Sequence, residues 1–308
     1  MKVCFMGTPE FGAVSLQALI DAGHEVAAVF TQPDRPKGRG NKMLFSPVKE
    51  VAVRYGIPVY QPEKISRESV EVLRELAPDV CVTAAFGQFL SETLLAIPKH
   101  GTINVHASLL PKHRGSAPIN WSIINGDPVT GVTTMMTVRK MDAGDILLKS
   151  ETEIGENETA GALTDRLARM GADLLIRTLS MISEGNCPRT PQNEDEMTYE
   201  PMLTKEIGKI DWSADAFKVH RLICGTSPWP GAFTTINSET VKIHASLIRN
   251  DFTAEAGSIV SADRKNGLVI ACGKGAIEIT ELQMPGGKRM MAKDYFLGHT
   301  INSDKAGN

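Results

Sequence analysis

The sequence predicts a doubly wound α/β domain with a mostly parallel sheet, followed by a small β-rich domain. The chain has 308 residues, and at about 150 residues per domain this length suggests two domains. Apolar strand-like runs alternate with helix-like stripes over residues 1–185, a pattern typical of parallel sheets with helical crossovers. Short strand-like runs separated by turn residues follow residue 206, as in a small barrel or sandwich.

Local sequence patterns predict the strands and helices of the first domain. KVCFMG is an apolar run that reaches a Gly-Thr-Pro turn within seven residues, which predicts a buried first strand rather than a secretion signal. Ser46 and Pro47 should begin a helix that Gly56 ends. DVCVTAAF shows no alternation, as expected of a parallel strand buried on both faces. The other expected elements are a helix from Thr8 and Pro9 to Gly23, strands at HEVAAVFT, IPVY and GTINVHAS, strands around 130–138 and 145–153, and helices around 67–77, 116–126 and 159–184.

A change of composition marks the boundary between the domains. Residues 186–206 hold three prolines and an acidic cluster, which predicts an extended linker. We therefore expect a first domain over 1–188, a linker over 189–206 and a second domain over 207–308. Strands of the second domain are expected at GKIDWS, AFTTI, VKIHASLI, GSIVSA, GLVIAC and AIEITELQ, with a helix around 214–224.

The composition excludes several classes of protein. Values of 42% hydrophobic, 22% charged and 6% aromatic residues exclude disorder, collagen and coiled coils. The five cysteines have no paired spacing, which argues against a disulfide framework or a metal site and favours a reducing, cytoplasmic compartment. No window approaches the roughly 18 apolar residues of a membrane span.

The net charge of −3 conceals an asymmetry. Residues 1–206 carry 21 Lys and Arg against 26 Asp and Glu, whereas residues 207–308 carry 12 against 10. Six of the 21 cations of the first region lie between residues 34 and 54. A polyanion could meet both regions. The alternative is a solvated charged loop beside a nearly neutral domain.

The first turn argues against a dinucleotide enzyme. That chemistry needs G-x-G-x-x-G after the first strand, so that backbone N–H groups can approach a pyrophosphate. Here Pro9 removes one N–H and Glu10 adds negative charge. A nicotinamide-dependent reductase is therefore disfavoured, and the absence of G-x-x-x-x-G-K-[ST] disfavours a P-loop NTPase.

Three residues near strand ends or turns have side chains suited to catalysis. Asn104 and His106 are two apart and share one face of a strand. An Asn amide can donate to an oxyanion, His can transfer protons near neutral pH, and Asp142 in the MDAGD turn could orient the imidazole. No serine or cysteine has a nucleophile-elbow context, so acyl transfer to an amine without a covalent intermediate fits. Taken alone, the three residues could equally be structural.

GTINVHASLLPKHRGSAPINW resembles the core motif of the 10-formyltetrahydrofolate-dependent formyltransferases, and the similarity extends from MGTPEFG to GKRMMAKDYFLGH. The resemblance implies a Rossmann-like fold, catalytic roles for Asn104, His106 and Asp142, and 10-formyltetrahydrofolate as co-substrate, with no tightly bound cofactor and no metal. The residues that it implies for folate binding are Phe86, Gly87, Gln88, Phe89, Leu90, Ser108, Leu109, Leu110 and Pro111.

Two features resemble the branch of this family that formylates methionine on initiator tRNA for translation initiation. They are the loop TQPDRPKGRGNK, expected to be structureless, and an OB-like second domain with KIDW, SPWPGAF and GKRM. Phe11 could line the methionine pocket, with core packing as the alternative. The implied tRNA-binding residues are Arg35, Lys37, Arg39, Lys42, Lys209, Lys242, Lys288 and Arg289.

Two positions depart from the branch pattern. Cys224 stands where arginine is usual, which would remove one phosphate contact, and His113 stands where an aromatic is common, which we expect to affect only the rim of the site. A formyltransferase for a small amine, such as an amino sugar or nucleotide, is the main alternative. An RNA-binding protein with an inactive α/β domain is a further one. We expect a monomer.

Overall fold

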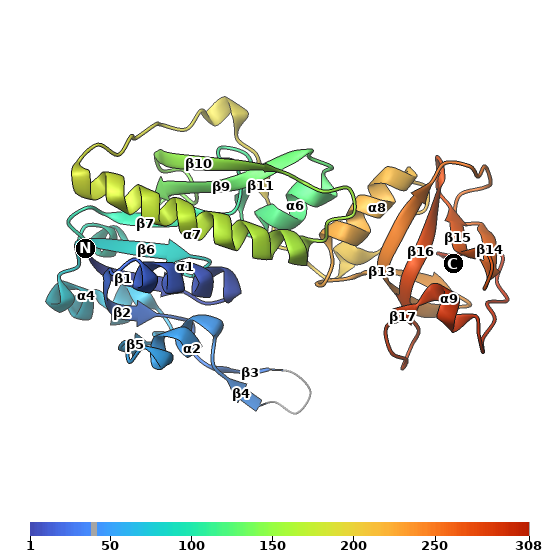
Figure 1. Ribbon diagram of the computed structural model, residues 1–308, viewed down its shortest axis with the longest axis horizontal. Coiled ribbons are helices and arrows are strands. Elements are labelled where there is room, and N and C mark those ends of the chain that lie inside the picture. Colours follow the sequence, from blue (N-terminus) through green and yellow to red (C-terminus); the bar gives the residue numbers. More distant parts are fainter. Residues whose placement is uncertain (38–41, 308) are drawn as a thin grey trace. The chain divides into compact units, whose positions relative to one another are not determined.

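A seven-stranded sheet organises the first part of the computed structural model, which describes residues 1–37 and 42–307 without the side chains of Lys37 and Lys42 (Figure 1). The strand order is β10-β9-β7-β6-β1-β2-β5. The pairs β5–β2, β2–β1, β1–β6 and β6–β7 are parallel, whereas β9 is antiparallel to β7. The predicted doubly wound, mostly parallel sheet is confirmed. Its strands are β1 (Lys2–Gly7), β2 (Glu25–Phe30), β5 (Val59–Tyr60), β6 (Val80–Ala84), β7 (Thr102–His106), β9 (Val129–Met136) and β10 (Ile146–Glu153).

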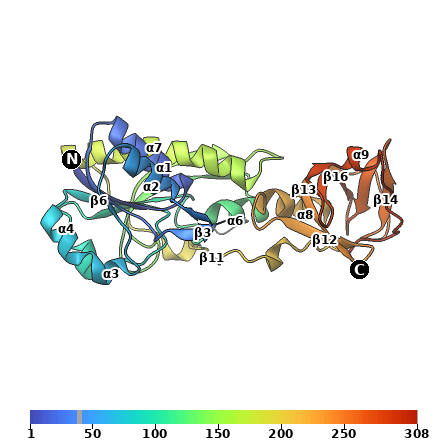
Figure 2. The ribbon, with the colours of Figure 1, turned by 90° about the horizontal axis from the view of Figure 1, so that it is seen from below.

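Helices cover both faces of this sheet. Figure 2 shows α1 and α7 on one face and α3 and α4 on the other. On the second face, Met6 and Phe30 of the sheet share one buried cluster with Ile65 and Leu73 of the helices. The central strand β6 is buried along its whole length, as its unbroken apolar sequence predicted. The helices of this part are α1 (Glu10–Asp21), α2 (Pro47–Arg54), α3 (Ile65–Glu68), α4 (Val70–Leu76), α5 (Glu92–Leu95) and α7 (Ala160–Glu184).

The starts of the first two helices show how local sequence sets an element boundary. Ser46 caps α2 as predicted, since its hydroxyl accepts from the backbone N–H of Lys49 at 3.1 Å. The predicted cap at Thr8 is wrong, because α1 begins after Pro9 and the Thr8 hydroxyl donates to the carbonyl of Phe86 instead. That hydrogen bond ties the end of β1 to the loop after β6.

The basic segment predicted to be a structureless loop contains a hairpin. Strand β3 (Arg35–Lys37) pairs antiparallel with β4 (Lys42–Leu44). The residues of β3 and β4 can both adopt an extended backbone. Their pairing satisfies N–H and C=O groups that an unpaired loop would leave to bind water. Leu44, the last residue of β4, and Phe45, which follows it, are half-exposed to solvent.

A six-stranded antiparallel sheet organises the second part, which confirms the predicted β-rich domain. The predicted strand at GKIDWS is wrong. A 3₁₀ turn ends at Gly208, the segment forms one bridge from Lys209 to Phe233, and Trp212 is buried with its indole N–H donating to Thr234 at 2.9 Å. The elements are β12 (Ala232–Ile236), β13 (Glu239–Arg249), β14 (Ile259–Asp263), β15 (Gly267–Ala271), β16 (Ala276–Gln283), β17 (Met290–Met291), α8 (Ala216–Gly225), α9 (Ala292–Tyr295) and the 3₁₀ turn η2 (Glu206–Gly208).

The chain divides into two compact units that differ from the segments predicted as domains. One is Met1–Gly115, Thr130–Thr152 and Thr164–Glu200; the other is Ser116–Val129, Glu153–Leu163 and Pro201–Asn308. Helix α6 (Pro118–Ile124) therefore belongs with the C-terminal unit. Two hydrogen bonds join it to α8: Asn120 Nδ2 donates to the Gly225 carbonyl at 2.8 Å, and Arg221 Nε donates to the Ile123 carbonyl at 3.0 Å.

Most of the predicted linker belongs to the first unit. Its strand β11 (Tyr199–Glu200) pairs in parallel with β8 (Arg114–Gly115), which lies within the site motif GTINVHASLLPKHRGSAPINW, and the 3₁₀ turn η1 (Glu194–Glu196) precedes β11. Within the described residues, no helix has both the length and the apolar character that a membrane crossing needs.

Candidate active site

Strand β7 carries the first two predicted catalytic residues. Asn104 lies in its middle and His106 at its end. The Thr83 hydroxyl, on neighbouring β6, donates to Asn104 Oδ1 at 2.9 Å. Since the carboxamide oxygen is occupied in this way, Nδ2 is the end of Asn104 that is left to donate to a ligand.

The His106 ring is held in one tautomer. The ring is 6% exposed, and Nε2 lies 2.9 Å from the carbonyl oxygen of His113. A carbonyl only accepts hydrogen bonds, so Nε2 carries the hydrogen. Nδ1 faces Asp142 Oδ1 at 3.7 Å, which is an ionic contact rather than a direct hydrogen bond. Nδ1 is therefore the ring atom at which the imidazole can take up or release a proton, and it faces the Asp142 carboxylate.

Backbone groups fix the direction of the Asp142 carboxylate. Its Oδ2 accepts from the N–H of Gly115 at 2.9 Å, and its backbone adopts a left-handed φ of 50°. Asp tolerates this conformation better than most residues. The three predicted catalytic residues therefore come together in the first unit, although they come from a strand and from a distant turn.

Two residues of this site were not predicted from the sequence. Gln192 donates from Nε2 to the carbonyls of Asp142 and Gly144, both at 2.8 Å. Its Oε1 accepts from Nε and Nη2 of Arg114, at 3.0 and 2.8 Å. Arg114 is 2% exposed and also pairs with Glu194 at 2.8 Å. Arg114, followed by Lys140, lowers the pKa of Glu194 to about 2. Gln192 lies in the proline-rich segment, where no spacing rule marks one polar residue as special.

His113 is not a rim residue, which corrects the expectation from the sequence. Its side chain is buried, its φ is 56°, and Nδ1 lies 2.9 Å from Glu200 Oε1. Its carbonyl is the acceptor for His106. The backbone of His113 therefore supports the His106 imidazole directly.

Gly115 follows His113 and Arg114 and donates its backbone N–H to the Asp142 carboxylate. Replacing Gly115 with alanine should destabilise the protein. At its φ of 112°, a Cβ would lie 2.3 Å from the Glu200 carbonyl oxygen. Backbone strain and crowding together should lower the free energy of unfolding by about 2 to 4 kcal/mol, measured by urea denaturation. Gly56→Ala is the matched control, because Gly56 has a φ of 66° and open space around it; its cost should be about 1 kcal/mol. Equal losses in the two variants would contradict the crowding.

The predicted folate-binding residues follow two neighbouring parallel strands, β6 and β7. After β6, Phe86 and Leu90 are buried in the core, and Gln88 bonds the backbone of Ile65 and Pro62. Gly87 is exposed, and Phe89 is 70% exposed. Gly87 and Phe89 are therefore the members of this segment that are free to contact a ligand.

The segment after β7 is more deeply buried. Ser108 and Leu110 are fully buried, and the Ser108 hydroxyl donates to the Lys112 carbonyl at 2.7 Å. Pro111 is buried as well, whereas Leu109 is half-buried. The structure assigns Ser108, Leu110 and Pro111 to the shape of this loop, and Leu109 remains accessible.

Phe11 has a core position. Its side chain is 6% exposed, and its ring lies next to Gly171 of α7, where an added Cβ would be 3.5 Å away. These contacts favour the core-packing alternative over a methionine pocket.

The predicted tRNA-binding residues fall into two groups. Arg35 is exposed on β3, whereas Arg39 and the side chains of Lys37 and Lys42 lie outside the described residues. In the second unit, the exposed residues Lys209 and Lys242 both pair with Phe233, and Lys242 also pairs with Gln283. This pairing places the two cations in one row across the sheet.

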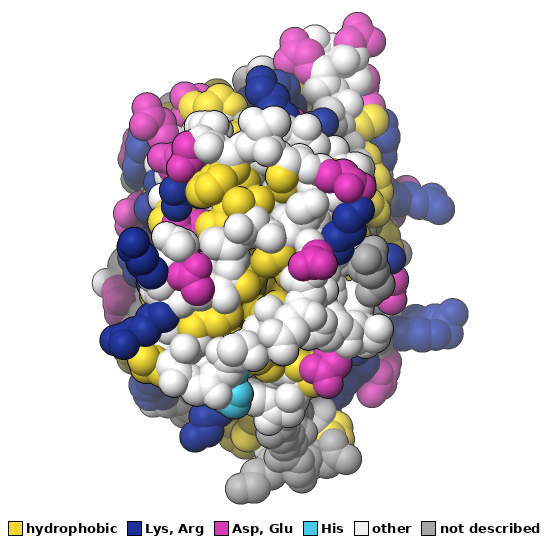
Figure 3. All heavy atoms as spheres, turned by 90° about the vertical axis from the view of Figure 1, so that its right-hand side faces the viewer, with side chains coloured by type: hydrophobic (Ala, Val, Ile, Leu, Met, Phe, Trp, Pro, Cys, Tyr) yellow, Lys and Arg dark blue, Asp and Glu magenta, His cyan; other side chains and the backbone are white. Residues whose placement is uncertain are grey.

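Lys288 and Arg289 are also exposed, just before β17, and Arg289 forms an ion pair with Glu281. Gln283, in the same row as Lys242, donates to the Gly287 carbonyl at 2.9 Å, so the turn carrying these cations adjoins that row. On the face seen in Figure 3, cationic and anionic side chains are interspersed around apolar ones. Any polyanion contact there would be made by single cations rather than by one continuous basic patch.

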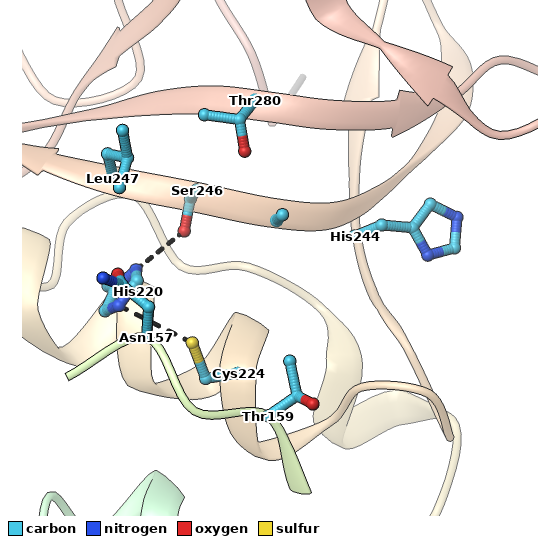
Figure 4. A pocket seen from close by; sticks show the side chains of 9 residues that line it. Asn157, Thr159, His220, Cys224, His244, Ser246, Leu247 and Thr280 are labelled. Atoms are coloured by element: carbon cyan, nitrogen blue, oxygen red, sulfur yellow. Dashed lines mark hydrogen bonds between the residues drawn. The ribbon is translucent and has the colours of Figure 1, made fainter. Parts of the chain in front are cut away.

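A hollow of about 250 Å³ lies in the second unit against α8 and β13 (Figure 4). His220 lies in its wall, with Nδ1 2.9 Å from the Ser246 hydroxyl and Nε2 3.1 Å from the Glu156 carbonyl. Burial lowers the pKa of His220 and raises the pKa of the Cys224 thiol to about 11. Cys224 is therefore a neutral, buried wall residue at neutral pH, neither a nucleophile nor a surface contact.

Comparison with known proteins agrees with this geometry. The formyl transferase family model matches residues 1–179, and the model of the formyl transferase C-terminal domain matches residues 202–300. The methionyl-tRNA formyltransferase of Alkaliphilus oremlandii is 48% identical over 303 residues, covering 98% of this chain and 97% of that protein. The enzyme of the same name from Ruminiclostridium cellulolyticum is 49% identical over 307 residues, covering 98% of each chain.

Solved structures share the fold at low identity. The sugar 3N-formyl transferase WlaRD has a TM-score of 0.68 at 19% identity, covering 94% of this chain and 98% of that one. HypX from Aquifex aeolicus in complex with tetrahydrofolic acid has a TM-score of 0.64 at 17% identity and covers 97% of this chain. The chain spans 48% of the length of HypX. Since both family models match in order and the full-length relatives are nearly half identical, the chain belongs to the formyl transferase family, in its methionyl-tRNA formyltransferase branch.

Proposed function

We propose that this protein transfers the formyl group of 10-formyltetrahydrofolate to the α-amino group of methionine carried by initiator tRNA. The observation that most supports this proposal is that Asn104, His106 and Asp142 come together in one site. The chain is also 48% identical, over nearly its whole length, to a methionyl-tRNA formyltransferase. We further infer that it acts as a monomer in the cytoplasm, where initiator tRNA is used.

In this proposal the free amine attacks the formyl carbon. The new C–N bond forms as the carbonyl becomes a tetrahedral oxyanion, and the bond from carbon to N10 of the folate then breaks. Asn104 Nδ2 donates to the oxyanion, because its Oδ1 is occupied by Thr83. A preorganised donor of this kind contributes about 3 to 4 kcal/mol of barrier lowering.

Proton transfer is assigned to His106 and Asp142. The amine loses one proton as the new bond forms, and N10 gains one as it leaves. Because His106 Nε2–H is engaged by the His113 carbonyl, Nδ1 is the atom that takes and returns the proton. His106 can also donate to the oxyanion, but only in its protonated form. Asp142 Oδ1 lies 3.7 Å from Nδ1, where it can pair with that form.

The folate is expected to contact the accessible residues of the two loops. Gly87, Phe89 and Leu109 offer backbone and apolar surface beside the ends of β6 and β7, which are the usual ligand side of such sheets. The buried residues Phe86, Leu90, Ser108, Leu110 and Pro111, together with Gln88, would then shape the pocket.

We expect Arg39→Ala to raise KM for charged tRNA about tenfold or more, because one charge-assisted phosphate contact is removed. KM for folate should stay within about twofold. The slope of the logarithm of the tRNA-binding constant against the logarithm of salt concentration should become shallower by about one unit. Lys99→Ala is the matched control, since Lys99 is exposed at the opposite, amino end of the parallel strands. Equal effects on both substrates would place Arg39 in the active site instead.

The proposal is tested by incubating the protein with 10-formyltetrahydrofolate and methionine-charged initiator tRNA, and by following formylmethionine after mild deacylation. Charged elongator tRNA and glycinamide ribonucleotide serve as parallel acceptors. Formylation of initiator tRNA alone supports the chemistry and the acceptor. Turnover on the small amine alone would leave the chemistry standing and contradict the tRNA assignment.

A further inference from the structure

A short segment, residues 198–200, lies against the residues that hold His106 and Asp142 of the proposed site. The Thr198 carbonyl accepts from the Arg114 N–H at 2.9 Å, and the Thr198 hydroxyl accepts from the His113 N–H at 2.7 Å. Glu200 pairs with Gly115 through its backbone and with His113 through its carboxylate, at 2.9 Å from Nδ1. The segment therefore contacts three consecutive residues of the site motif.

Two of these contacted residues, Gly115 and His113, bind a reacting group directly. The Gly115 N–H donates to Asp142 Oδ2, and the His113 carbonyl accepts from His106 Nε2. Glu200 is thus one residue away from both the carboxylate and the imidazole. Its side chain is 11% exposed and that of His113 is 10% exposed, so solvent screens their interaction little.

His113 needs such support because of its backbone. Its φ of 56° is left-handed, a conformation that costs energy for a residue with a Cβ and that persists only where surrounding contacts favour it. In this conformation its carbonyl accepts from both His106 and the Ser108 hydroxyl, at 2.9 and 3.4 Å. A right-handed or extended backbone would turn that carbonyl away from His106.

We propose that Glu200 is a positioning residue for formyl transfer. It holds His113 so that the His113 carbonyl keeps His106 in the Nε2–H tautomer, with Nδ1 directed at Asp142. This inference rests on the proposed function, and it assigns a role in the reaction to a residue of the segment that joins the two units. Without the carboxylate, the ring of His106 should sample the other tautomer and lose its orientation.

The test compares Glu200→Ala and Glu200→Gln with the wild type. Glu200→Ala should lower kcat about tenfold or more, because misplaced catalytic groups lose rate steeply, while KM for both substrates changes less than about twofold. Glu200→Gln should lose less, since its amide oxygen can still accept from His113 Nδ1. Glu196→Ala is the matched control: Glu196 is exposed, lies four residues before Glu200, and its carboxylate accepts from Asn193. That variant should keep wild-type kcat.

A spectroscopic readout separates positioning from stability. The ¹⁵N shifts of the His106 ring, assigned with His106→Gln, should report the Nε2–H tautomer in the wild type and a mixture in Glu200→Ala. Unchanged kcat in Glu200→Ala, or a lower kcat with an unchanged His106 tautomer, would overturn the inference. A lower melting temperature with unchanged kcat per folded molecule would overturn it as well. Because the tautomer is measured without substrate, its result is independent of whether formylation of tRNA is observed.

Discussion

Replacing Asn104 with aspartate is expected to lower kcat by about 10²–10³-fold. The Thr83 hydroxyl donates to Asn104 Oδ1, so the opposite end of the carboxamide provides the donor. Aspartate keeps the acceptor for Thr83 but places a negative oxygen where the donor stood. The oxyanion would then develop next to a like charge instead of an N–H group, which raises the barrier without changing the shape of the site.

Steady-state formylation of charged initiator tRNA measures this loss, and fluorescence quenching by folate measures binding. Folate affinity should stay within about twofold of the wild type, because an interaction realised only in the transition state affects kcat and not binding. Asn237→Asp is the matched control, since it makes the same chemical change in an exposed turn of the second unit. Near-wild-type turnover of Asn104→Asp with unchanged folate affinity would show that Asn104 is not the oxyanion donor.

The sequence could predict the parts of this fold that depend on local chemistry. The unbroken apolar run of Val80–Ala84 became a fully buried parallel strand, and the Ser46–Pro47 pair became a capped helix start. Both patterns depend on the needs of a single element. The strand needs apolar residues for burial on two faces, and the helix start needs an acceptor for a free N–H group. The order of elements over residues 1–185 carried the same kind of information, and it was sufficient to predict the sheet.

Local chemistry was not sufficient where distant segments meet. Gln192 and Glu200 lie in a polar, proline-rich stretch whose composition predicts a linker, yet their side chains hold Asp142 and His113. Such contacts join residues 50 or 87 positions apart in the sequence, and no periodicity marks them. The wrongly predicted strand at GKIDWS shows the converse case. The segment looks strand-like, but it forms only one bridge, from Lys209 to Phe233, and the Trp212 indole is buried with its N–H donating to Thr234.

The candidate site was likewise predicted only in part from the sequence. The residue types of Asn104, His106 and Asp142 indicated the chemistry, and the resemblance to a family selected them from many similar pairs. Their mutual geometry needed the structure, because the tautomer of His106 depends on a carbonyl seven residues away in a left-handed backbone. Likewise, only the structure shows that the side chains of Phe86, Ser108 and Leu110 are buried.

Replacing Asp142 with asparagine is expected to lower kcat by about 10²–10⁴-fold, the usual contribution of general acid–base catalysis. Asparagine has nearly the same shape, and its carboxamide oxygen can still accept from the Gly115 N–H. Its amide group would then face His106 Nδ1 and donate to it, which stabilises the neutral ring and opposes protonation at the atom assigned to proton transfer.

Two comparisons make the Asp142→Asn experiment decisive. Asp145→Asn changes a second carboxylate of the same turn, so it should keep wild-type kcat if the loss is specific to the charge that faces His106. The melting temperature should barely move in either variant, because the asparagine that replaces Asp142 can retain the hydrogen bond that fixes the turn. If Asp142→Asn instead turned over at a rate near that of the wild type across the pH range of activity, proton transfer would not depend on this carboxylate. His106 would then have to exchange its proton with the substrates alone, and the 3.7 Å approach of Asp142 Oδ1 to Nδ1 would serve only to orient the ring.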